Sequence, residues 1–271
     1  MPDVFQSIDE IDADKQTMIA ERLESRAAMP KFVAVRDAYF EAIDLPSVGH
    51  LLELGCGTGA VCRAIATWPG FEGEVSGSDL SESLINTAER LTDAAGIKGI
   101  KFLQADGQGS TAHEGDFDMV LGHTVISHVA DPDAFLSEAL RLVRPGGRVV
   151  IHDGDYASMT FDTGAPEYDK VLPAKYFDAI IANPFVMREM PRRLSQMGVR
   201  SSEAIGAVVL EAGTGEYFPG IIRNYAPIAV AAGVVSDAET AGWIAALDRA
   251  LEHQSFFASC NFVTYVFERE A

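Results

Sequence analysis

The run HLLELGCGTGA (residues 50–60) is an apolar strand that breaks into three glycines on alternate positions. Gly55, Gly57 and Gly59 let the backbone turn sharply after a strand, and they let a ligand approach where any Cβ atom would collide. The pattern predicts a strand, loop and helix unit that holds a nucleotide-like ligand. Glu53 lies just before the glycines, so its carboxylate is expected to face water or a cation beside the loop.

Short apolar strands alternate with helical patterns on both sides of these glycines. Such alternation indicates βαβ units and a parallel sheet covered on both faces, with ligands at the carboxyl ends of the strands. We therefore predict an α/β core. The predicted strands are 50–54, 74–78, 100–103, 118–122 and 148–153, and the helices between them are about 59–67, 82–95 and a third that begins with the Asp131 cap and Pro132.

The chain is expected to divide into four segments. Apolar stripes at helical spacing predict two helices before the core. After Asp155 the alternation lapses, and two proline-punctuated helical patterns, too short to bury much alone, suggest an insertion over the ligand edge of the sheet rather than a second core. The segments are an N-terminal helical cap (1–45), a cofactor-binding core (46–155), a helical substrate lid (156–203) and the C-terminal part of the core sheet (204–271).

Composition restricts the partners. The formal net charge is −19, and so acidic a surface repels phosphate backbones and anionic lipid, which argues against nucleic acid and membranes. The sequence has neither the roughly 18 apolar residues of a membrane span nor a signal peptide. Cys56, Cys62 and Cys260 lack paired spacing, so neither disulfides nor a metal site is expected. A cytoplasmic location is the expectation.

The glycine pattern alone leaves two ligands open. GCGTGA also satisfies the dinucleotide pattern, and Asp79 lies about 20 residues onward, as an NAD(P)-dependent oxidoreductase requires. Glu53 instead favours a ligand with an ammonium or sulfonium group. Asp79 can accept hydrogen bonds from the ribose of either ligand, and Asp106 can accept from an adenine amine while Gly107 admits the ring.

Five motifs taken together resemble the class I S-adenosylmethionine-dependent methyltransferases, in particular the small-molecule group that includes ubiquinone and menaquinone biosynthesis enzymes. These motifs are ELGCGTG (53–59), Asp79, Ala105-Asp106, FDMVLGHTVISHV (117–129) and RPGG (144–147). The resemblance is strong over residues 33–155 and hardly extends to 156–200. It implies a Rossmann-like seven-stranded sandwich, S-adenosyl-L-methionine as cofactor, a small-molecule acceptor and, as one option, a homodimer.

The resemblance also implies roles for individual residues. Structural alternatives stay open for some of them: the glycines could only permit a tight turn, Asp79 could cap the next helix, and Asp106 could be a turn residue. The implied cofactor-binding residues are Glu53, Gly55, Cys56, Gly57, Asp79, Leu80, Asp106, Gly107, Gly122 and His123.

The implied reaction is in-line attack on a sulfonium methyl group, in which the protein supplies alignment and excludes water. An oxygen or carbon acceptor needs a general base, for which His128 is the candidate, with bracing of its loop as the alternative. The candidate acceptor contacts are Asp155, Tyr156, Arg223 and Tyr225, and for Arg223 a surface ion pair is an open alternative. An oxidoreductase and a non-catalytic S-adenosylmethionine-binding module remain the rival functions.

Overall fold

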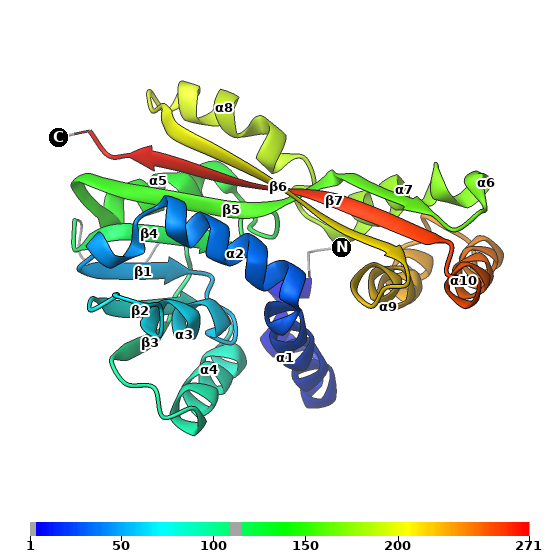
Figure 1. Ribbon diagram of the computed structural model, residues 1–271, viewed down its shortest axis with the longest axis horizontal. Coiled ribbons are helices and arrows are strands. Elements are labelled where there is room, and N and C mark those ends of the chain that lie inside the picture. The colour runs from blue at the N-terminus through cyan, green and yellow to red at the C-terminus, as the bar shows by residue number, and fades with distance from the viewer. Residues whose placement is uncertain (1–3, 109–114, 271) are drawn as a thin grey trace.

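A seven-stranded sheet runs through the molecule (Figure 1). The computed structural model describes residues 4–108 and 115–270, and its strand order is β3-β2-β1-β4-β5-β7-β6. The first five strands are parallel, whereas β7 runs antiparallel to both β5 and β6. The predicted seven-stranded Rossmann-like sandwich is confirmed. The strands are β1 (His50–Leu54), β2 (Glu74–Asp79), β3 (Ile100–Gln104), β4 (Phe117–His123), β5 (Val143–Asp162), β6 (Ser201–Gly213) and β7 (Phe256–Glu268).

Helices cover both faces of the sheet, because β1 and β4 send apolar side chains alternately to each side. Leu51 and Leu121 pack with α2 and α3 on one face, whereas Leu52 and Val120 pack with α5 and α8 on the other. The helices are α1 (Ala13–Ala28), α2 (Pro30–Ala42), α3 (Ala60–Ala66), α4 (Glu82–Ala94), α5 (Pro132–Leu142), α6 (Pro166–Asp169), α7 (Leu172–Ile180), α8 (Val186–Gln196), α9 (Tyr217–Ala231) and α10 (Asp237–Glu252).

Local sequence signals place several helix ends. The Asp131 side chain accepts hydrogen bonds from the amides of Asp133 and Ala134 at the start of α5, and Ser236 with Glu239 forms a capping box at the start of α10. The Asp131 cap agrees with the sequence prediction.

The segment after Asp155 differs from the prediction. β5 continues to Asp162, and its residues 160–162 pair with residues 257–259 of β7, so part of the expected helical insertion is strand. The alternating pattern of β7 extends over 13 residues, and a strand of that length in a sheet interior needs paired neighbours along it. That requirement extends β5 beyond the core.

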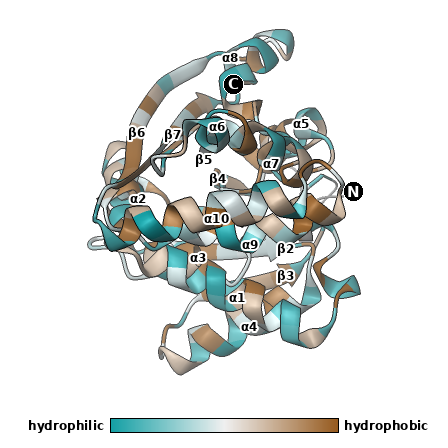
Figure 2. Cartoon of the chain, turned by 90° about the vertical axis from the view of Figure 1, so that its right-hand side faces the viewer, coloured by the Kyte–Doolittle hydropathy of each residue, from teal (hydrophilic) through white to brown (hydrophobic). Residues whose placement is uncertain are grey.

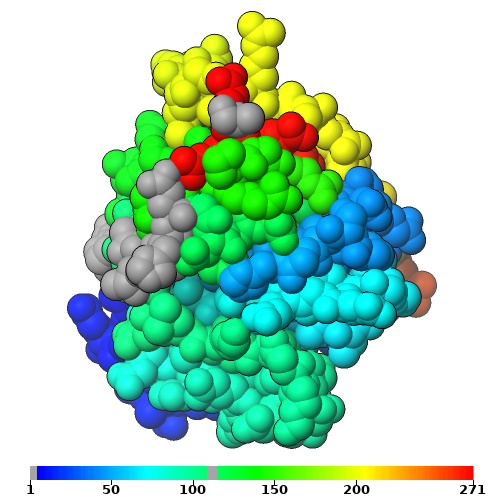
Figure 3. All heavy atoms as spheres, turned by 90° about the vertical axis from the view of Figure 1, so that its left-hand side faces the viewer, coloured from blue at the N-terminus to red at the C-terminus, as the bar shows by residue number. Residues whose placement is uncertain are grey.

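The extended strands carry a hydrophobic cluster of their own. Tyr176 of α7, Phe218 of α9 and Trp243 of α10 are among its buried members, and the cluster is separate from those that cover the core sheet. A second hydrophobic centre therefore exists where only a thin insertion was expected. Figure 2 looks onto this end, with α10 in front of the strands. Figure 3 shows the opposite end, where the red β7 lies between green β5 and yellow β6.

We expect Asp169→Ala to destabilise this second cluster. The Asp169 carboxylate accepts hydrogen bonds from the indole of Trp243 at 2.9 Å and from the amide and hydroxyl of Thr163. Removal would leave a buried donor unsatisfied, which costs about 1–3 kcal/mol. Urea unfolding measures the change in the free energy of unfolding. Glu167→Ala, at an exposed position on the same helix, is the control and should change that free energy by no more than about 0.5 kcal/mol. Equal stabilities of the two variants would contradict the assigned role.

Candidate active site

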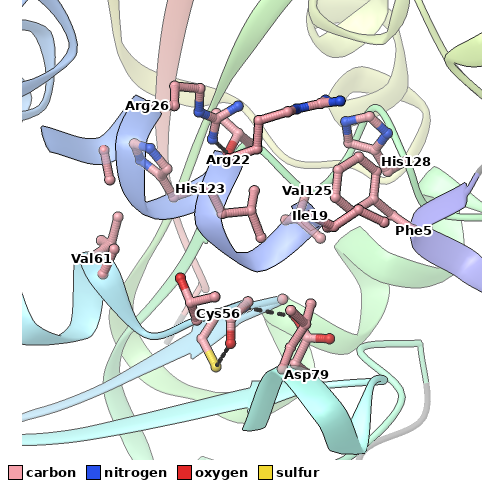
Figure 4. Close-up of a pocket in the computed structure, with 18 of the residues that line it drawn as sticks. Phe5, Ile19, Arg22, Arg26, Cys56, Val61, Asp79, His123, Val125 and His128 are labelled. Carbon is pink, nitrogen blue, oxygen red and sulfur yellow. Dashed lines mark hydrogen bonds between the residues drawn. The ribbon is translucent and has the colours of Figure 1, made fainter. Parts of the chain in front are cut away.

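A cavity of about 610 Å³ lies at the carboxyl ends of β1, β2 and β4 (Figure 4). The loops that follow these strands form its floor, and α1 and α9 contribute its cover. This is the sheet edge at which the sequence predicted a ligand, because parallel strands present their ends together there. The cover differs from the prediction: of residues 156–203, only Tyr156 lines the cavity.

The glycine loop is bound to the neighbouring strand. The amides of Gly55 and Cys56 both donate to the Ser78 carbonyl, at 2.7 and 2.8 Å. Gly55 has a φ of +72°, and a Cβ atom there would lie 2.3 Å from a methyl carbon of Val125. Gly57, with a φ of +53°, lines the cavity. The loop conformation therefore depends on glycine at both positions.

Asp79 connects the loop to the start of α4. One of its oxygens accepts from the Gly57 amide at 2.8 Å and the other from the Ser81 amide at 3.0 Å. Burial raises the pKa of Asp79, and these two hydrogen bonds oppose that shift. Ser81, not Asp79, caps α4, so the helix-cap alternative for Asp79 is wrong. A carboxylate has about four lone-pair sites, so two remain for ribose hydroxyls.

The predicted adenine end also lies on the cavity. Leu80, Asp106 and Gly107 line it. Asp106 accepts from the Gln108 amide at 2.9 Å, so it has the turn role that the sequence left open and still keeps a second oxygen for a ligand. A Cβ atom on Gly107 would lie 3.1 Å from the Phe135 ring, so the glycine permits close packing of that ring.

The Glu53 carboxyl group is buried, whereas the sequence predicted a carboxylate that faces water or a cation. Its side chain lies in the cavity wall but the residue is only 2% exposed, and the Cys62 thiol donates to it at 2.9 Å. Burial raises the pKa of Glu53 to about 8, although the bond from Cys62 opposes the shift. The carboxyl group is therefore largely protonated at neutral pH until a cation lies beside it.

His123 forms part of a buried aromatic stack. Its Nδ1 atom lies 2.8 Å from the Tyr39 hydroxyl, and its ring stacks on His152 with centroids 4.8 Å apart. Burial lowers the pKa of both histidines, to about 3 for His152. Both imidazoles are neutral wall residues. The adjacent Gly122 does not line the cavity; a Cβ atom there would lie 3.1 Å from Ile151, so its role is packing.

The candidate base and two of the acceptor contacts face the same cavity. His128 lies with its ring centroid 4.6 Å from that of Phe5 and 6.1 Å from that of Tyr156. Tyr156 and Tyr225 line the cavity with it. The carbonyl oxygen of His128 accepts a bond from the Gln6 side chain at 2.6 Å, which ties its loop to the N-terminal segment.

The other two acceptor contacts are corrected. Asp155 does not line the cavity, because both its oxygens lie 2.8 Å from Nε of Arg188 on α8. Arg223 points from α9 to Asp248 of α10 at 2.5 Å, which is the ion pair left open as its alternative.

The sequence reasoning missed the arginines of the cover. Arg22 and Arg26 of α1 and Arg36 of α2 line the cavity. Arg22 and Arg26 are four residues apart, a spacing that places two side chains on one helix face. That spacing was the available signal.

Comparison with known proteins identifies the core. Residues 47–171 match the family described as methyltransferase domain. This match supports the predicted resemblance to the class I S-adenosylmethionine-dependent methyltransferases. No finding favours the oxidoreductase or the non-catalytic alternative.

Individual relatives of this chain agree with the match. It is 28% identical over 211 residues to an uncharacterized 37.1 kDa protein in a transposon of Streptomyces fradiae, covering 77% of this chain and 60% of that one. It is 36% identical over 101 residues to the ubiquinone biosynthesis O-methyltransferase of Maricaulis maris, covering 37% and 39%. The chain therefore spans less than two thirds of the length of either relative.

A solved structure extends the likeness to the fold. A putative methyltransferase from Bacillus halodurans superposes with a TM-score of 0.60 at 14% identity, covering 85% of this chain and 98% of that one. Among the described residues, no helix is long and apolar enough to cross a membrane. No group of three metal-ligating side chains is found in the same part of the chain.

The affinity for S-adenosylmethionine should rise with pH through Glu53. Its pKa of about 8 leaves the carboxyl group protonated at pH 6 to 7, and a cationic ligand favours the ionised form. Binding therefore releases a proton below about pH 8, and affinity rises by up to about tenfold per pH unit toward pH 8.

Calorimetry in two buffers of different ionisation enthalpy measures this release. The relevant quantity is the difference in the number of protons released between wild type and Glu53→Gln. The Glu53→Gln variant should not release the proton that wild type releases from Glu53. Glu82→Gln, an exposed acid on α4, should behave as wild type. A wild-type profile that matches Glu53→Gln would show that no cation lies beside this carboxyl group.

Proposed function

We propose that the protein transfers a methyl group from S-adenosylmethionine to an oxygen or carbon of a small organic metabolite. One observation carries the proposal: a single cavity joins the glycine loop and Asp79 to His128, Tyr156 and Tyr225. Donor and acceptor can therefore meet in one cavity, which is what in-line transfer requires.

The residues present fit the donor. Asp79 keeps free lone pairs for ribose hydroxyls, Asp106 keeps an oxygen for an adenine amine, and Glu53 can balance a positive charge. Gly55, Cys56 and Gly57 would pass beside the donor, with His123 at its methionine end. The bound donor would supply a sulfonium methyl group open to nucleophilic attack.

His128 would accept the proton of an acceptor hydroxyl. Asp153 supports this role, because it is fully buried below the same loop, where the Ser127 amide and hydroxyl donate to it at 3.1 and 2.9 Å. Burial raises the pKa of Asp153, and the charge of His128 lowers it. A carboxylate near the imidazole stabilises the imidazolium that proton transfer would create.

Further expectations accompany this proposal. The three cysteines are free and buried, which supports a reducing compartment such as the cytoplasm. Similarity to a ubiquinone biosynthesis O-methyltransferase supports a role in biosynthesis. A homodimer stays a prediction.

Loss of the loop conformation should severely weaken donor binding. Gly57→Val forces a branched side chain to a φ of +53°, and Asp79→Ala releases the amides of Gly57 and Ser81. Each variant should bind S-adenosylhomocysteine at least about tenfold more weakly by calorimetry while circular dichroism keeps the folded spectrum. Asp93→Ala, at the exposed end of α4, is the matched control. Wild-type affinity in both loop variants would overturn the donor site.

His128→Ala should reduce turnover without a matching loss of donor affinity. General-base catalysis contributes about 10²- to 10⁴-fold to the rate. The kcat for S-adenosylhomocysteine formation should therefore decrease by a factor in that range. His253→Ala, on the exposed end of α10, should leave kcat unchanged. If His128→Ala also keeps kcat, the histidine only braces its loop.

A further inference from the structure

His128 lies in a tight turn (residues 125–129) that follows β4, and not on a helix or strand. Its amide donates to the Val125 carbonyl at 2.9 Å, which closes the turn. Connecting segments of this kind are more mobile than the elements they join unless other groups hold them. A general base must lie within about 2.6–3.2 Å of the atom whose proton it accepts. The proposed reaction therefore depends on what holds the His128 turn.

Three consecutive carbonyl groups of the His128 turn accept hydrogen bonds from distant parts of the chain. Asn183 donates its backbone N–H to the Ser127 carbonyl at 2.8 Å and its side-chain amide to the Val129 carbonyl at 2.7 Å. Between them, the His128 carbonyl accepts from the Gln6 side chain at 2.6 Å. Asn183 therefore brackets His128 on both sides, while Gln6 holds the residue itself.

Asn183 is in turn held by the start of α8. Its carbonyl accepts from the Val186 amide at 3.2 Å, and Pro184 after it disfavours a helical backbone at Asn183. Val186 and Met187 are buried in the same hydrophobic cluster as Ile126 of the His128 turn. The linker and the turn therefore share one packed base, and this packing keeps Asn183 next to the carbonyl groups that it binds.

These contacts give the linker between α7 and α8 (residues 181–185) a role that the cavity wall does not reveal. Asn183 does not line the cavity, so it cannot touch a ligand bound there. It acts on His128 only through hydrogen bonds to the backbone on either side. Catalytic side chains keep their geometry when surrounding hydrogen bonds and packing fix them within about 0.5 Å.

The imidazole itself has aromatic neighbours on the N-terminal segment and on β5. Its centroid lies 4.6 Å from that of Phe5 and 6.1 Å from that of Tyr156, and Figure 4 shows Phe5 beside His128. Because Phe5 precedes Gln6, the N-terminal segment contacts both the ring and the backbone of His128. Contacts with these two rings therefore report where the imidazole lies.

Resting on the proposed function, in which His128 is the general base, we propose that Asn183 and Gln6 are positioning residues that hold the His128 imidazole toward the acceptor. A misplacement of about 1 Å can reduce a rate by about 10²-fold. Hydrogen bonds from outside the cavity thereby decide whether the base is effective, and Asn183 contributes to the position of the base without contributing to donor affinity.

Nuclear magnetic resonance of the full chain tests this proposal, with histidine labelled at Cε1 and the protein saturated with S-adenosylhomocysteine. Wild type should show nuclear Overhauser cross-peaks from His128 to Phe5 and Tyr156. Asn183→Asp and Asn183→Leu remove the side-chain donor at nearly constant size, so each should lose the cross-peak to Tyr156. Because only one of these variants is charged, a loss in both excludes a direct effect of charge.

Two further variants complete the design. Gln6→Met removes the other donor and should lose the cross-peak between His128 and Phe5. Asn86→Asp, at an exposed position on α4, is the matched control and should keep both cross-peaks. Both Asn183 variants should bind S-adenosylhomocysteine as wild type does, and the signals of His123 and His152 in their separate stack should not change.

Wild-type cross-peaks from His128 in both Asn183 variants would overturn the proposal. If neither of them gives the folded circular dichroism spectrum, Gln6→Met decides, and an unchanged cross-peak to Phe5 in that variant overturns it. The proposed function fails by different results: wild type that does not bind S-adenosylhomocysteine, or an unchanged kcat in His128→Ala. Neither of those results depends on where Asn183 holds the turn.

Discussion

The carboxylate of Asp79 holds together the floor of the cavity. It ends β2, accepts from Gly57 in the glycine loop and accepts from Ser81 at the start of α4. The Ser78 carbonyl beside it holds the first two amides of the same loop. Hydrogen bonds to a charged, partly desolvated acceptor are stronger than neutral ones, so the loop is fixed before a ligand arrives. A preformed site avoids the cost of ordering its loop during binding.

The cover is held by contacts of a different kind. Glu24 of α1 pairs with Arg63 at 2.7 Å and accepts from the Thr58 hydroxyl at 2.5 Å, while Arg22 reaches Tyr225 of α9. The Glu24–Arg63 pair is partly buried, with side chains 33% and 13% exposed, so solvent screens it less than a surface pair. These contacts tie α1 both to the glycine loop and to α9.

Sequence patterns predicted the floor well and the cover poorly, for a physical reason. Glycine spacing and strand ends are local properties, so the positions of Gly57 and Asp79 followed from short motifs. The raised pKa of Glu53 depends on its burial beneath α3, whose Cys62 contacts it, and no local pattern contains that packing. Likewise, the face of α9 that carries Arg223 is directed to Asp248 by packing on the extended strands. That packing exists only once β5 and β7 pair beyond the core.

The floor and the cover differ in charge, and this difference gives the proposed reaction a direction. Glu53, Asp79 and Asp106 line the cavity on the proposed donor side, and Figure 4 shows Arg22 and Arg26 across the cavity from Asp79. Proton transfer to His128 would move the positive charge from the donor side toward Asp153. Glu53, with a pKa of about 8, would then regain its proton at neutral pH. Protonated Glu53 would attract the neutral thioether of the product less than ionised Glu53 attracts the sulfonium of the donor. The chemistry itself would therefore weaken binding on the donor side and favour release.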